Sequence, residues 1–110
     1  MEASLAGLVE TIAVYPVKAA PDGPLQRIRS KLADEGFTIG EADELDLAAR
    51  RGPDRLFLGL GARPEGLTAR WKAKSLVPGR AGEIHRTAER IVDEVLGAPE
   101  RVLQGPGAQR

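Results

Sequence analysis

The chain has 110 residues, of which 42% are hydrophobic and 29% charged, a composition typical of one folded globular domain. Its 16 basic and 16 acidic side chains cancel, so overall charge does not support a general polyanion-binding role, and only a local basic patch could do so. The absence of cysteine excludes disulfides, thiolate metal sites and a cysteine nucleophile. No signal peptide and no run of membrane-spanning length is recognised, so we expect a cytoplasmic protein without membrane contact.

We expect residues 9–97 to form a single α/β domain, with a flexible N-terminus at residues 1–8 and a disordered tail at residues 98–110. Val9–Pro16 opens the domain. This segment is rich in β-branched residues and ends at a proline, which predicts the first strand.

A helix is predicted between the loop Ala19–Gly23 and Gly36. Pro24 fits its first turn, where a missing N–H costs nothing. The apolar face of this helix would be formed by Leu25, Ile28, Leu32 and Ala33. Phe37–Gly40 then predicts a short second strand. The order strand, helix, strand favours a right-handed parallel crossover.

The segment Glu41–Arg51 fits two structures. Leu45, Leu47 and Ala49 alternate as they would in a strand. In favour of a helix, the acids come first, the arginines come last and Gly52 follows, which matches a helix dipole from end to end. We favour a short helix, with a strand as the alternative. The acids at its negative start would be Glu41, Asp43, Glu44 and Asp46.

The most apolar run, Arg55–Ala62, predicts the central strand, covered on both faces. Leu67–Ala73 alternates strictly and predicts an antiparallel edge strand. Its core-facing residues would be Leu67, Ala69, Trp71 and Ala73. A last helix is predicted from about Gly82 to Leu96, and its apolar stripe would be formed by Ile84, Ala88, Ile91, Val92 and Val95. The predicted fold is a small two- or three-layer α/β domain in the order β-α-β-α-β-β-α, with a mostly parallel sheet and one antiparallel edge hairpin.

A basic stripe follows the outward face of the predicted edge strand. It consists of Arg70, Lys72 and Lys74, with Arg63 at the start of the hairpin. A solvated edge is the simplest interpretation, and contact with an acidic partner or an RNA backbone is the functional alternative.

No catalytic constellation is recognised. His85 is the only histidine, and we expect it on the surface with Glu89 one turn further along the helix. An enzyme that uses His85 with Tyr15 or an acid is kept as a further alternative. Gly59 and Gly61 lack the following helix that a phosphate-binding loop needs, so they indicate close packing of a covering helix.

Asp34 and Glu35 end the first predicted helix, where acids oppose the helix dipole. An acid in that position indicates a compensating cation or a basic partner. We therefore predict Asp34 and Glu35 as a site that bridges to a cation or to a basic partner. The chain by itself is expected to bind no cofactor.

Ile12–Val14, the helix end Lys31–Phe37, the run Leu56–Gly61 and the segment Leu67–Pro78 follow in an order that resembles the small subunit of the reactivating factors of adenosylcobalamin-dependent diol and glycerol dehydratases. The resemblance implies a short α/β chaperone subunit that docks on a larger ATPase subunit. In that family an acid at the end of the first helix contacts a metal held by the large subunit, and Asp34 matches that position. The resemblance therefore implies that Asp34 is a candidate ligand of a divalent cation shared at the partner interface, with Glu35 beside it.

Leu56–Gly61 and the charged hairpin Arg63–Lys74 are also similar to the anticodon-binding domain of class II aminoacyl-tRNA synthetases. That resemblance implies an RNA- or tRNA-binding module. We favour a non-catalytic interaction subunit that docks on a larger protein, with the RNA-binding module and a small enzyme of unknown reaction as alternatives. Self-association into a homo-oligomer stays open.

Overall fold

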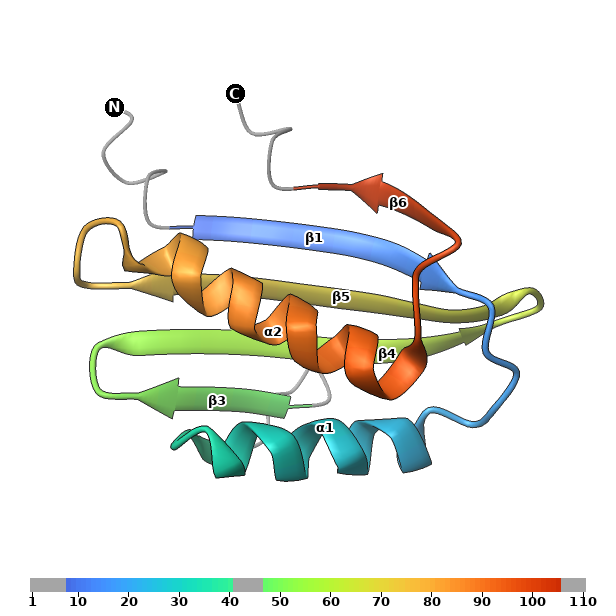
Figure 1. Cartoon of the computed structure of the whole chain (residues 1–110), viewed down its shortest axis with the longest axis horizontal. Coiled ribbons are helices and arrows are strands. Elements are labelled where there is room, and N and C mark those ends of the chain that lie inside the picture. Colours follow the sequence, from blue (N-terminus) through green and yellow to red (C-terminus); the bar gives the residue numbers. More distant parts are fainter. Residues whose placement is uncertain (1–7, 41–46, 106–110) are drawn as a thin grey trace.

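The strands form one antiparallel sheet, and both helices pack on the same face of it (Figure 1). The structure is a computed structural model that describes residues 8–40 and 47–105. Within these residues the elements are β1 (Leu8–Tyr15), α1 (Asp22–Asp34), β2 (Thr38–Gly40), β3 (Leu47–Arg51), β4 (Asp54–Arg63), β5 (Gly66–Ser75), α2 (Arg80–Leu96) and β6 (Arg101–Gln104). Their order across the sheet is β2-β3-β4-β5-β1-β6.

The predicted mostly parallel sheet is wrong, because the strand that follows α1 does not lie beside β1. β1 pairs antiparallel with β5, and α1 carries the chain to β2 at the far edge. The strands β2 to β5 then form a meander in which each pairs antiparallel with the next. The β4–β5 turn uses Gly66 with φ of 153°, and a side chain there would overlap the Tyr15 carbonyl. This turn therefore packs directly on the end of β1.

The segment for which the sequence favours a helix contains a strand. Leu47 and Ala49 of β3 are buried, while Ala48 and Arg50, which alternate with them, are not. Burial of this alternating pair against the helices therefore outweighs the dipole-like order of acids and arginines. The predicted acidic start at residues 41–46 lies outside the described residues.

β4 lies inside the sheet as predicted, but only one of its faces is covered. Leu56, Leu58 and Leu60 are buried on the helix side. Phe57 and Gly59 alternate with them and lie on the face that neither helix covers. β5 has β4 on one side and β1 on the other, so its prediction as an edge strand is also wrong. The edges of the sheet are β2 and β6.

The core lies between the sheet and the two helices. α2 lies across β5, β4 and β1, and α1 packs beside α2 and against β2. Of the apolar stripe predicted for the last helix, Ile84, Ala88, Ile91 and Val92 are buried, at 0–1% exposure. The predicted core residues of β5 are buried as well. Truncating a large side chain here, such as Ile91→Ala, would cost roughly 2–5 kcal/mol.

The structure places a strand, β6, within the region predicted as a tail. β6 pairs antiparallel with β1, and the Glu100 N–H donates to the Val14 carbonyl at 2.7 Å. All four β6 residues are exposed, as befits a short edge strand. Neither helix of the described residues combines the length and the apolar character needed to cross a bilayer.

Candidate nucleic-acid interface

The helices leave one face of the sheet uncovered, and we call it the open face. Strand residues point alternately to the two faces, so the neighbours of the buried leucines of β4 and of the core residues of β5 point to this face. Its cations on β3, β4 and β5 are Arg50, Arg55, Arg63, Arg70, Lys72 and Lys74. Among the described strand residues, Glu10 on β1 is the only acid on this face.

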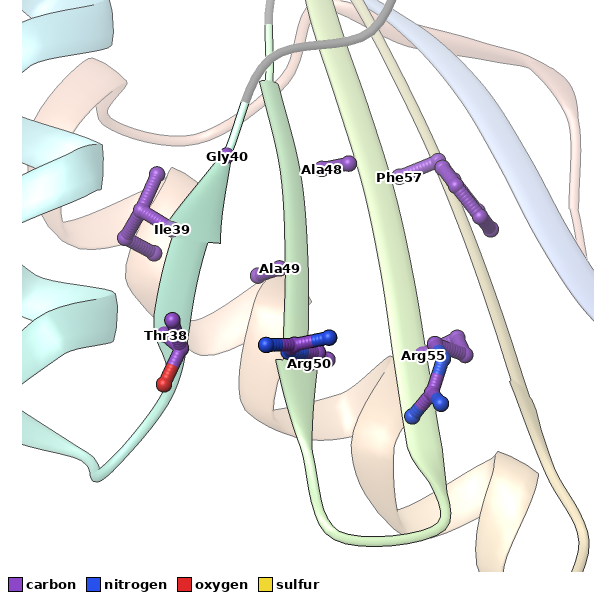
Figure 2. Close-up of a pocket in the computed structure, with 8 residues that line it drawn as sticks. All are labelled: Thr38, Ile39, Gly40, Ala48, Ala49, Arg50, Arg55 and Phe57. Carbon is purple, nitrogen blue, oxygen red and sulfur yellow. The ribbon is translucent and has the colours of Figure 1, made fainter.

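Three of these cations stand side by side, and we call them the cationic row. Arg50 on β3 is the register partner of Arg55 on β4, which is the partner of Lys74 on β5. Adjacent strands lie about 4.8 Å apart, so the row spans roughly 10 Å. Figure 2 shows Arg50 and Arg55 next to each other, with Thr38 beyond them on β2. Like charges directly opposite each other destabilise a sheet, so an anion bound at this row would relieve a repulsion.

An aromatic ring lies in the next row of the open face. Phe57 is paired with Ala48 on β3 and with Lys72 on β5. Its side chain is half-buried and does not belong to the core beneath the helices. In the row after that, Gly59 is paired with Arg70. The ring is therefore bordered by cations. The next residue of β4 on the same face is Gly59, which has no side chain.

Most of the positive charge of the open face is not compensated within the described part of the chain. Apart from Arg63, which pairs with Glu65, none of its cations has a carboxylate oxygen within 4.0 Å among residues 8–40 and 47–105. Arg55 donates from Nη1 to the carbonyls of Gly52 and Asp54, at 2.7 and 2.9 Å. These bonds hold its guanidinium at the turn without neutralising it. A chain with zero net charge therefore has one distinctly basic surface.

A groove of about 390 Å³ lies on the β2 side of the open face (Figure 2). Its lining residues are Thr38, Ile39, Gly40, Ala48, Ala49, Arg50, Arg55 and Phe57. The glycine and the alanines leave room beside the aromatic ring, while the two arginines border the groove with positive charge. Its volume is at the lower end of the range for small-ligand pockets, roughly 300–1,000 Å³.

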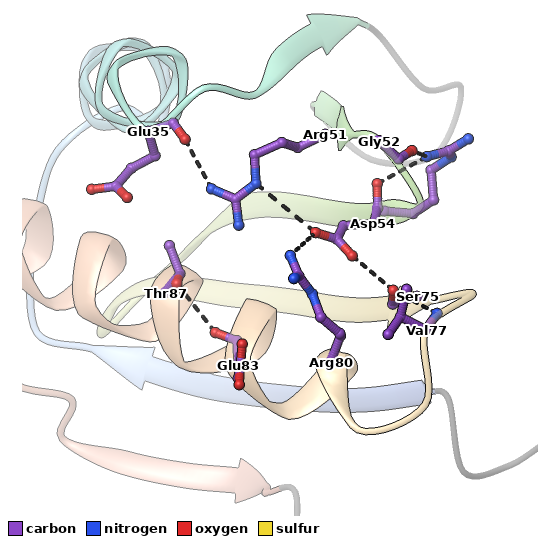
Figure 3. Close-up of polar contacts among 10 residues, drawn as sticks. Glu35, Arg51, Gly52, Asp54, Ser75, Val77, Arg80, Glu83 and Thr87 are labelled. Atoms are coloured by element: carbon purple, nitrogen blue, oxygen red, sulfur yellow. Dashed lines mark hydrogen bonds and ion pairs between the residues drawn. The ribbon is translucent and has the colours of Figure 1, made fainter.

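The turn that holds Arg55 is fixed on the opposite face by Asp54 (Figure 3). Asp54 is fully buried, and its carboxylate accepts from Ser75 Oγ at 2.7 Å and from Arg80 Nη2 at 2.6 Å. The Nε of Arg51 lies 3.9 Å away. Burial alone would raise the pKa of Asp54, but these two hydrogen bonds and the charges of both arginines lower the pKa below its ordinary value. Asp54 therefore ties the β3–β4 turn to β5 and to the start of α2.

The predicted basic stripe divides into two parts. Arg70, Lys72 and Lys74 lie on the open face. Arg63 lies on the same face at the end of β4, where its Nη1 donates to Thr68 Oγ1 at 3.2 Å and its Nε is 3.3 Å from Glu65 Oε2. That ion pair compensates Arg63 locally, so the open face depends on the other three and on Arg50 and Arg55.

Asp34 and Glu35 are exposed at the end of α1. Glu35 Oε2 accepts from Arg90 Nη2 at 2.9 Å, and the Glu35 carbonyl accepts from Arg51 Nη1 at 2.8 Å. Arg90 therefore compensates the charge of Glu35 within the chain, while no cation among the described residues lies within 4.0 Å of the Asp34 carboxylate. Among the described residues, no group of three or more His, Asp or Glu could hold a metal ion. A role of Asp34 at a partner interface stays a prediction.

His85 is buried, so its predicted surface position is wrong. It is 3% exposed, its Nε2 lies 2.7 Å from Thr11 Oγ1, and its ring centroid is 5.8 Å from that of Trp71. Burial lowers the pKa of His85, so the ring is neutral at neutral pH. The Tyr15 hydroxyl donates to Asp93 at 2.8 Å, and burial with this bond raises the Tyr15 pKa. Both pairs join β1 to α2, and none of their residues lines the groove.

Sequence reasoning missed Arg50, Arg55 and Phe57. It assigned Arg50 to a helix and the other two to a strand covered on both faces. The signal that could have found them is the alternation in β4, where Arg55 and Phe57 are interleaved with Leu56 and Leu58. An arginine two residues from a phenylalanine is typical of a face that meets water.

Comparison with protein-family models, with curated proteins and with solved structures finds no match to this chain. The resemblances to the reactivase small subunit and to the anticodon-binding domain therefore stay predictions.

Proposed function

We propose that this protein binds single-stranded nucleic acid on the open face of its sheet. The observation that supports this most strongly is the cationic row next to Phe57. A row of positive charges without acidic partners among the described residues matches a phosphate backbone, and an aromatic ring within the same face matches the bases.

Phosphate binding accounts for the electrostatics of the row. Arg50, Arg55 and Lys74 repel one another in the free protein, and anions between them remove that repulsion. Lysines and arginines that neutralise phosphates also release condensed counterions, which drives association at low salt. The same residues thus destabilise the free sheet and favour the bound state.

An acidic protein partner would account for the cations but not for the ring. Carboxylates need only the positive charges, whereas bases need an apolar surface on which to stack. Phe57 and the groove lined by Gly40 and Ala48 provide such a surface between the cations. Nucleic acid therefore explains more of the open face than an acidic polypeptide does.

The proposed role is binding rather than catalysis. The sole histidine of the chain lies in the core, and Glu10 is the only acid on the described strands of the open face. Catalysis on the open face would require a nucleophile with an acid–base partner, or a metal.

The double variant Arg50→Gln, Lys74→Gln tests the proposal. We expect its affinity for a labelled oligouridylate of about 12 nucleotides to fall roughly 10- to 30-fold at 0.1 M salt, because two phosphate contacts are lost. The slope of log K against log salt concentration should become shallower by about 1.4. Fluorescence anisotropy over a salt series measures both quantities, and the matching oligodeoxyuridylate distinguishes RNA from DNA.

Arg27→Gln is the matched control, because it removes one exposed arginine from α1 on the other side of the molecule. It should leave affinity and slope nearly unchanged. The proposal fails if the wild-type protein binds neither oligonucleotide at about 50 mM salt, or if the control weakens binding as much as the double variant. Stronger competition by poly-glutamate than by unlabelled oligonucleotide would assign the open face to an acidic protein instead.

A further inference from the structure

We infer that the groove holds one unpaired nucleobase stacked on Phe57, with the adjoining phosphate on the cationic row. This inference rests on the proposed function and names the part of the nucleic acid that is recognised. It requires contact with the face of a base, whereas the proposed function alone could be met by the backbone.

The position of Phe57 is the first reason. An aromatic side chain contributes most to stability when it is buried, yet this ring lies on the face that the helices do not cover. Leu56 and Leu58 on either side of it are fully buried, so β4 does not need Phe57 to anchor it in the core. A half-buried ring among cations has an unfilled apolar surface that a planar ligand can cover.

The space beside the ring is the second reason. Gly40 and Ala48 continue the row of Phe57 across β2 and β3, and they carry no side chain larger than a methyl group. A Cβ placed at Gly40 would meet only the Ala48 carbonyl, at 3.9 Å. Figure 2 shows the ring leaning over β5 and away from Ala48. The two small residues therefore leave a clear area beside the ring about two strands wide, roughly 10 Å.

The distance between ring and row is the third reason. Phe57 and Arg55 are two residues apart on one face of β4, which corresponds to about 6.7 Å. A ligand that reaches both must combine a planar apolar group with an anion a few ångströms away, which is the layout of a nucleotide. In a duplex, neighbouring pairs cover the base faces, so stacking on Phe57 requires an unpaired base.

Phe57→Leu tests this inference, since it keeps an apolar side chain but removes the ring. We expect affinity for the single-stranded oligouridylate to fall roughly 5- to 150-fold, the effect of losing one base–aromatic stack. Affinity for heparin, a polyanion without bases, should change less than twofold. Phe57→Tyr should restore the oligonucleotide affinity, because its ring can stack as well.

A second measurement needs no variant. In the complex of the wild-type protein, the ring current of Phe57 should shift base protons of the bound oligonucleotide upfield in the NMR spectrum, and Phe57→Leu should abolish the shift.

The inference is overturned if Phe57→Leu leaves oligonucleotide affinity unchanged while Arg50→Gln, Lys74→Gln weakens it, a result that keeps the proposed function. Equal losses for heparin and oligonucleotide in Phe57→Leu, or base protons that do not shift, also overturn it. If the wild-type protein binds no oligonucleotide, both this inference and the proposed function fail.

Discussion

At the scale of single residues, Asp54 determines how the β3–β4 turn is held. Its carboxylate is fully buried, and its hydrogen-bond partners Ser75 and Arg80 come from β5 and α2. A buried carboxylate is costly unless its oxygens are bonded. Here Oδ1 accepts from Ser75 and Oδ2 from Arg80, so both oxygens are satisfied on the core side of the turn. These bonds thereby fix the backbone of the turn, and Arg55 projects from that fixed backbone on the other side.

We expect Asp54→Asn to lower the free energy of unfolding by roughly 1–3 kcal/mol, because the amide keeps the shape but leaves Arg80 without its anion. Urea denaturation followed by the fluorescence of Trp71, the only tryptophan and 1% exposed, measures this loss. The pKa of Asp54 is lowered on folding, so the carboxylate stabilises the fold above its ordinary value of 3.8 and this contribution is lost as pH falls through the lower folded value.

Asp34→Asn is the control for that experiment, since Asp34 is exposed at the end of α1. It should change stability by no more than about 0.5 kcal/mol. An Asp54→Asn protein as stable as the wild type at pH 7 would show that the carboxylate does not hold the turn.

At the scale of elements, two buried polar pairs join β1 to α2. Thr11 and Tyr15 of β1 contact His85 and Asp93 of α2, and both pairs lie on the core side of the sheet. β1 lies beside β5 in the sheet, and these contacts connect this first element of the chain with the last helix.

We expect this connection to weaken as the solution becomes mildly acidic. The pKa of His85 is lowered by burial, so the unfolded chain takes up a proton near pH 6.5 while the folded protein does not. Stability is therefore fully present above pH 6.5 and falls as pH decreases toward the folded pKa. The melting temperature between pH 7.5 and 5.5 should drop more for the wild type than for His85→Gln. Equal drops would mean that His85 is accessible to protons in the folded state.

Strand pairing limits how much of this fold could be predicted from the sequence. The stripe of α2 and the alternation of β5 are local patterns, and both predict buried faces correctly. Which strand lies beside β1 is decided by distant contacts, and the meander from β2 to β5 leaves no local signal that distinguishes it from a parallel crossover. His85 had a signal that was overlooked, because it is spaced three residues from Ala88 and seven from Val92, both buried.

The candidate site was predictable only in part, for the same reason. Arg70, Lys72 and Lys74 could be placed on one face from their spacing in β5 alone. Arg50 and Arg55 join them only through the register of β3 and β4, which the sequence does not display. A charge cluster that is assembled across strands is therefore invisible until the pairing is known.

At the scale of the whole molecule, a neutral chain has two chemically different sides. The helices carry paired charges, including Arg90 with Glu35 and Lys31 with Glu94. Apart from Arg63, which pairs with Glu65, the cations of β3, β4 and β5 on the open face have no such partners among the described residues. The net charge of zero therefore does not indicate whether this protein binds a polyanion. A polyanion would contact one side of the molecule, and the two sides differ in charge.

Photo-crosslinking of a single-stranded RNA that contains 4-thiouridine, followed by mass spectrometry of the crosslinked peptides, tests most directly whether the open face binds nucleic acid. We predict crosslinks in β3, β4 and β5, within residues 47–75, and their loss in Arg50→Gln, Lys74→Gln. Crosslinks confined to α1 and α2, at the same yield in both proteins, would contradict this assignment.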